Sequence, residues 1–188
     1  MPTLIDRQGV RADDWRLHEG PAGEALPGDA LLVPLSTWLS HSESLRSRHA
    51  RLGVLLGPAD DPAGIAADLD ALQLVAVSFP AFTDGRGYSI ARLLRERHGW
   101  RGELRAVGEV LRDQLFYMSR CGFDSFALAD GEPAEEALRH FETFGEPYQA
   151  AVDRGPLFAR RTAAPSRPAT APVAHAHPTG LGQQGATR

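Results

Sequence analysis

The sequence contains no lysine and no asparagine, and it has a single cysteine, Cys121. Without lysine there is no Schiff-base residue for pyridoxal phosphate and no lysine to complete a P-loop. One cysteine excludes an internal disulfide and a cysteine-rich metal site. No apolar run is long enough to cross a bilayer, and the N-terminus lacks the basic-then-apolar order of a signal peptide. We therefore expect a cytoplasmic protein without a membrane segment.

Acidic residues are abundant in most of the chain and absent from its end. Residues 1–158 hold 24 acidic residues against 16 arginines, a net charge of −8, whereas residues 159–188 hold four arginines and no acid. Nucleic-acid binding needs clustered positive charge. The composition therefore predicts that the protein does not bind nucleic acid.

Short apolar runs alternate with helix-like segments from Ala30 onward. The runs occupy residues 30–35, 52–56, 74–79, 103–107 and 123–128. Several are almost continuously apolar, as in strands buried on both faces. About five strand–helix units indicate an α/β fold with a mainly parallel sheet. Because a complete eight-unit barrel needs about 200 residues or more, we favour an open doubly wound sheet, with a partial TIM-like barrel as the alternative.

The two ends of the chain differ from this pattern. Residues 1–29 resemble a short β-rich lead-in, with Leu4-Ile5 and Trp15-Arg16-Leu17 on either side of a turn. We predict an α/β domain over 30–150. Residues 159–188 are rich in alanine and proline and have little apolar bulk, so we predict a disordered tail.

The first candidate site is the strand-to-helix junction Thr83–Ser89. Ligands of open α/β sheets bind beyond the carboxyl ends of the strands, and free amides with an arginine there favour an anion. Asp84 is a candidate helix cap, arginine partner or general base. An Asp–Gly turn with Asp84 as the cap explains the same residues. The predicted ligand-binding residues are Asp84, Gly85, Arg86, Gly87, Tyr88 and Ser89, with Asp84 also a candidate catalytic residue.

The second candidate site is the junction that follows the strand at 103–107. Gly108, Arg112 and Gln114 are predicted ligand-binding residues, and Asp113 is the second candidate catalytic residue. A solvated helix start explains these polar residues equally simply.

Arg105 lies within the predicted strand before that junction. A buried arginine needs a partner or a ligand, so we add Arg105 to the ligand-binding candidates, with Asp84 or Glu109 as its expected partner. An edge strand with Arg105 in water is the alternative.

The remaining chemical groups give weaker signals. Cys121 at a helix end is expected to be a core residue with an inert thiol. The pair His175 and His177 lacks further ligands, so we predict neither a metal site nor a cofactor.

The segments F-P-A-F-T-D-G-R-G-Y-S, G-E-L-R-A-V-G-E-V-L-R-D-Q-L and C-G-F-D-S-F-A-L resemble a bacterial family of unknown function. Its members are often labelled oxidoreductase and are typically encoded beside assimilatory sulfite reductase and adenylyl-sulfate reductase genes. The resemblance is close over residues 74–128 and looser from about 10 to 145. It implies a role in assimilation of sulfate to cysteine.

Three functions follow from the resemblance and the residues together. The first is an accessory protein that supports sulfite reductase, with the haemoprotein or another enzyme of sulfate assimilation as partner. The second is a small α/β enzyme or binding protein that holds an oxyanion or phosphate ester on the 84–89 loop. The third, a flavin or nicotinamide oxidoreductase, lacks a dinucleotide fingerprint.

Overall fold

A computed structural model describes residues 2–20, 30–142 and 152 of the chain. The tail prediction for 159–188, and the ends of the two predicted segments at 21–29 and 143–150, lie outside the described residues. Within them, no helix is long and apolar enough to cross a membrane.

One eight-stranded sheet organises the fold, in the order β2-β1-β8-β7-β6-β5-β4-β3. Neighbouring strands from β3 to β8 are parallel, and β1 is antiparallel to both β2 and β8. The strands are β1 (Leu4–Asp6), β2 (Gly9–Arg11), β3 (Arg16–Leu17), β4 (Ala30–Pro34), β5 (Arg51–Leu56), β6 (Leu74–Phe79), β7 (Glu103–Gly108) and β8 (Ser125–Ala127).

A helical segment follows each of the strands β4 to β8, which confirms the predicted strand–helix alternation. The helices are α1 (Leu35–Arg48), η1 (Pro62–Ala71), α2 (Arg86–Arg92), η2 (Leu93–Arg97), η3 (Arg112–Gln114), α3 (Leu115–Arg120), α4 (Ala134–Arg139) and η4 (His140–Glu142). The η1 segment begins with an N-cap: the Asp61 carboxylate accepts a hydrogen bond from the Ala63 amide, and Pro62 occupies the first turn.

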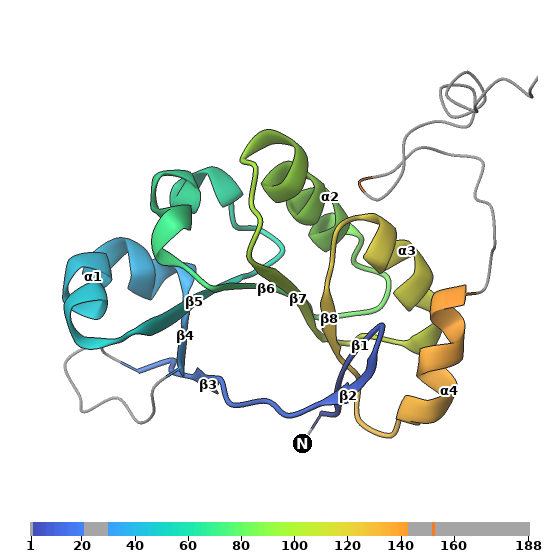
Figure 1. Cartoon of the computed structure of the whole chain (residues 1–188). Helices are drawn as coiled ribbons and strands as arrows, with labels where there is room; N and C mark the ends of the chain where they lie inside the picture. The colour runs from blue at the N-terminus through green and yellow to red at the C-terminus, as the bar shows by residue number, and fades with distance from the viewer. Residues whose placement is uncertain (1, 21–29, 143–151, 153–188) are drawn as a thin grey trace, which may run out of the picture.

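The sheet is curled, and Figure 1 shows the helices on its convex side. Strands β3 to β8 follow one another in chain order without a reversal. A doubly wound sheet would carry helices on both faces. The favoured doubly wound arrangement is therefore not confirmed, and the sheet has the form of a partial barrel.

Two apolar layers lie on the two faces of the sheet. Val75, Val77 and Phe79 of β6 point to the helix side and join the main core. Leu74 and Ala76 point to the concave side, where Trp15 packs against their smaller cluster. The segment 12–15, which we call the strap, crosses this concave side between β2 and β3 (Figure 1). Two of the lead-in strands, β2 and β3, thus form opposite edges of the sheet.

Candidate functional site

The two predicted junctions meet at the carboxyl edge of the sheet and are hydrogen-bonded to each other. The Gln114 side-chain amide donates to the Phe82 carbonyl at 3.0 Å, and its oxygen accepts from the Leu111 amide at 3.2 Å. The Glu109 amide also donates to the Phe79 carbonyl at 2.8 Å. Gln114 therefore uses both ends of its side chain to join the loop after β6 to the segment after β7.

Asp84 and Arg86 of the first junction are bonded to each other. The Asp84 carboxylate accepts from the Arg86 Nε and Nη2 at 2.9 and 2.6 Å, and from the Arg86 backbone amide at 3.2 Å. The hydrogen bond from the Arg86 side chain lowers the pKa of Asp84. This is turn and cap chemistry, and it makes Asp84 a weak base.

Two glycines of the candidate set, Gly87 and Gly108, are explained by their contacts with Phe79. A Cβ on Gly87 would lie 2.5 Å from the Phe79 ring. Gly108 has φ +98°, and a Cβ there would collide with the Phe79 carbonyl oxygen. Both positions bring backbone close to β6, so they allow tight packing without any bound ligand.

Tyr88 is half-buried between two aromatic rings. Its ring centroid lies 5.3 Å from that of Phe79 and 5.1 Å from that of Tyr117. Burial raises the pKa of Tyr88 to about 12. Ser89, the next residue, is exposed on α2. The Tyr88 side chain thus packs α2 against β6 and α3.

Arg105 is buried on the concave side of the sheet, away from both junctions. Only 3% of its surface is exposed. It donates to Asp13 of the strap at 2.8 Å and to Glu103 at 2.9 Å, while the Ser125 hydroxyl donates to the same Glu103 carboxylate at 2.5 Å. The expected partners Asp84 and Glu109 were therefore wrong. The sheet order places Glu103 and the strap, rather than the loops, next to this guanidinium.

Acidic side chains dominate the carboxyl edge. The segments that follow β5 to β8, residues 57–62, 80–86, 108–114 and 128–136, hold nine Asp or Glu residues and two arginines. Both arginines are in ion pairs with carboxylates of that edge: Arg86 with Asp84, and Arg112 with Glu136 and, at 3.9 Å, Glu132. Asp113, the second catalytic candidate, is exposed. This edge repels an anion and attracts a cation.

A cavity of about 380 Å³ at the carboxyl edge is also acidic. Its lining includes Glu109, Asp130 and Glu132, together with Gly108 and Leu128. In the described part of the chain, no three His, Cys, Asp or Glu side chains are grouped so that they could hold a metal ion.

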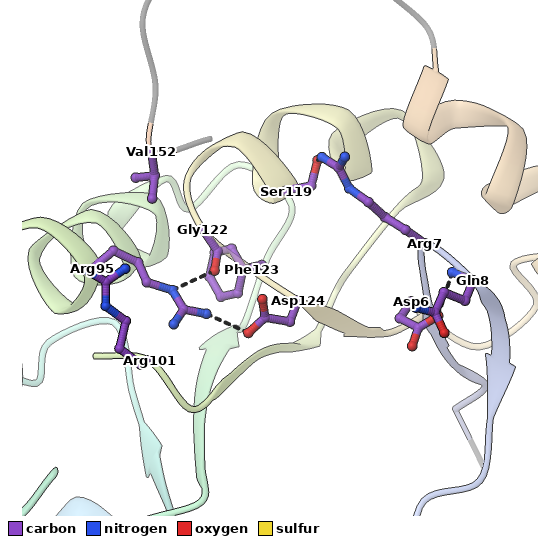
Figure 2. A pocket seen from close by; sticks show the side chains of 10 residues that line it. All are labelled: Asp6, Arg7, Gln8, Arg95, Arg101, Ser119, Gly122, Phe123, Asp124 and Val152. Atoms are coloured by element: carbon purple, nitrogen blue, oxygen red, sulfur yellow. Dashed lines mark hydrogen bonds and ion pairs between the residues drawn. The ribbon is translucent and has the colours of Figure 1, made fainter. Parts of the chain in front are cut away.

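A second cavity, of about 480 Å³, lies at the opposite, amino edge near the starts of β7 and β8 (Figure 2). Arg95 forms one wall. Its guanidinium donates to the carbonyls of Gly122, Trp100 and Gly102 at 2.9, 2.8 and 3.0 Å and to Asp124 at 2.5 Å. Arg95 is thus held entirely by the loops that begin these strands.

Sequence reasoning did not find the amino-edge cavity. Arg7 donates to the Ser119 hydroxyl at 2.9 Å across a separation of 112 residues. No local motif joins these two residues, and the rule that ligands of α/β sheets bind at the carboxyl edge predicts no site at the amino edge. Cys121 was placed correctly: it is 2% exposed, and burial raises the pKa of its thiol.

Comparison with protein families shows what this chain is similar to. Among curated proteins, none matches this chain. A family model described as bacterial protein of unknown function (DUF934) matches residues 53–158. This segment is more than half of the chain and contains most of β5, all of β6 to β8, both junctions and Arg105, while Arg7 and the strap lie before it. The chain belongs to the DUF934 family of bacterial proteins.

Proposed function

We propose that the protein is a cytoplasmic accessory protein of assimilatory sulfate and sulfite reduction, which binds the sulfite reductase haemoprotein or another enzyme of that pathway through its carboxyl edge. The pathway rests on the resemblance of residues 74–128 to proteins encoded beside those reductases. The choice of binding over catalysis rests on the geometry of the edge.

The excess of carboxylates at the carboxyl edge is the observation that carries this proposal. Nine carboxylates and two paired arginines give the edge a field that steers and orients a partner with a basic surface. Phe82, in the loop that Gln114 holds, is 58% exposed and offers an aromatic anchor within this acidic surface. Aromatic residues are enriched at the cores of protein interfaces.

The candidate catalytic residue Asp84 and the ligand-binding candidates Arg105 and Gln114 give less support to an enzyme. Asp84 is bonded to Arg86, Arg105 is bonded to Asp13 and Glu103, and Gln114 is bonded to backbone groups. An oxyanion on the 84–89 loop would have to compete with Asp84 for the Arg86 guanidinium. The acidic surroundings oppose it as well, so the anion-binding function ranks second and the oxidoreductase third.

The test is a pull-down of the purified sulfite reductase haemoprotein by the full chain, followed by titration calorimetry. We expect association that weakens as salt rises, because exposed charges are screened. Phe82→Ser and the double change Glu109→Arg with Asp113→Arg should each weaken it by about tenfold or more. Glu43→Arg, on the exposed surface of α1, is the matched control.

Two results would overturn the proposal. One is the absence of association with the haemoprotein and with the other sulfate-assimilation enzymes, together with normal sulfite reductase activity in a deletion strain. The other is equal loss of binding in the carboxyl-edge and Glu43 variants, since this would indicate a general charge effect.

A further inference from the structure

The amino-edge cavity has an uneven charge distribution. Three arginines and two carboxylates line it: Arg7, Arg95, Arg101, Asp6 and Asp124. Phe123 and Val152 add an apolar wall, and Ser119 adds a hydroxyl. Its volume of about 480 Å³ is in the range of small-molecule sites.

Both carboxylates already have partners within the protein. Asp124 accepts from Arg95 at 2.5 Å and from the Leu104 amide at 2.8 Å. Asp6 accepts from the amides of Gln8 and Gly9 at 2.7 and 3.1 Å and lies 3.6 Å from the Arg11 guanidinium. Their negative charge is therefore balanced before a ligand arrives.

In the part of the chain that the structure describes, no carboxylate compensates the charges of Arg7 and Arg101. Among the described residues, neither arginine forms an ion pair with a carboxylate. Arg7 donates to the Ser119 hydroxyl, its one side-chain hydrogen bond within the described residues, so further N–H groups of its guanidinium are left for a ligand. Arginine stays charged at every physiological pH, so these two side chains give the cavity a positive potential within an acidic protein.

The two arginines stand apart. Figure 2 shows Arg101 on the side of Arg95 and Arg7 on the far side, next to Ser119, with Phe123 between them. One small ion such as phosphate would contact a single arginine. A longer molecule would reach both.

We propose that this cavity binds a small organic molecule that carries an anionic group, phosphate or carboxylate, at each end, with one end on Arg7 and the other on Arg101. Planar guanidinium groups recognise both kinds of oxyanion through paired hydrogen bonds. The apolar wall of Phe123 and Val152 faces the middle of the ligand. This site is separate from the partner surface at the carboxyl edge, and either can exist without the other.

The experiment is titration calorimetry of the full chain at constant ionic strength. The probes are fructose 1,6-bisphosphate and fructose 6-phosphate in one arm, and adipate and hexanoate in the other. The probe with two anionic ends should bind about tenfold tighter than the one-ended probe of its arm, since each charge-assisted contact contributes that much. The pair of probes that shows this preference identifies the anionic group as phosphate or as carboxylate.

Variants connect the affinity to the two arginines. Arg7→Gln and Arg101→Gln should each weaken the two-ended probe by about tenfold, to the level of the one-ended probe. Arg139→Gln, an exposed change on α4, should leave the affinity unchanged. Circular dichroism and thermal melting of each variant establish that it is folded.

The proposal is overturned if neither arm shows a preference for two ends. It is also overturned if both cavity variants, while folded, bind as the wild type does, or if Arg139→Gln loses as much affinity as they do.

Discussion

The Gln114 side chain donates to the Phe82 carbonyl at 3.0 Å and thereby joins the loop after β6 to the segment after β7. Its oxygen accepts from the Leu111 amide as well. One side chain thus sets the relative position of two loops that strands alone would leave independent. The acidic surface of the carboxyl edge includes both loops.

Gln114→Ala should lower the free energy of unfolding by about 1 to 2 kcal/mol, because it removes two hydrogen bonds to backbone groups. Urea denaturation measures the change, and hydrogen exchange should become faster in residues 80–86 and 109–114. Gln8→Ala, an exposed glutamine on the β1–β2 turn, is the control. Equal stability of wild type and Gln114→Ala would show that these bonds do not hold the edge.

Gly87→Ala should destabilise the fold by about 1 to 3 kcal/mol, because the added methyl overpacks a filled site. Its Cβ would lie 2.5 Å from the Phe79 ring. Gly85→Ala is the matched control, since there the nearest atom is 3.8 Å away and φ is −81°. Thermal melting compares the two. If Gly85→Ala proves as harmful as Gly87→Ala, contact with Phe79 is not the cause.

Arg105→Met should lower the free energy of unfolding by about 3 kcal/mol, because it leaves Glu103 without its buried cationic partner. Asp13→Ala should cost less, since Asp13 is partly in water and Glu103 still binds Arg105. Arg92→Met, which breaks an exposed pair with Glu96 on one helix face, should cost under about 0.5 kcal/mol. Urea denaturation checks this order, and a reversal of Arg105 and Arg92 would contradict it.

Tyr88 should make stability fall at alkaline pH. Burial raises the pKa of its phenol to about 12, whereas in the unfolded chain it is about 10. The folded state therefore holds this proton more tightly, so the stabilisation is complete below pH 10 and is lost as pH rises through 10 to 12. The free energy of unfolding of wild type should therefore fall relative to that of Tyr88→Phe over that interval, as urea denaturation at each pH would measure. Parallel pH dependence would argue that Tyr88 titrates normally.

Local patterns predicted the elements well. The apolar run Leu74–Phe79 is strand β6, and Asp61 followed by Pro62 begins η1 as a cap and first turn should. Both depend on neighbours within a few residues. The role of Asp84 as an arginine partner was also predictable from the sequence, because Arg86 is only two residues away.

Contacts between distant segments were not predictable in this way. Arg105 bonds to Asp13 across 92 residues, and Arg7 bonds to Ser119 across 112. Which carboxylate meets Arg105 depends on the strap that crosses the concave side, and this in turn depends on β2 and β3 forming opposite edges of the sheet. The curl of the sheet was equally unpredictable, since no local pattern shows whether helices cover one face of the sheet or both.

The sequence by itself determined the strand–helix alternation, the absence of lysine chemistry, the inert cysteine and the family. Each of these follows from composition, from the spacing of nearby residues or from similarity along the chain. Only the tertiary structure decided that the carboxyl edge is a surface of paired and acidic groups. It also decided that Arg7 and Arg101, which have no carboxylate partner among the described residues, line a cavity at the other edge. Electrostatic potential depends on distances between side chains, and those distances are set by strand order and packing.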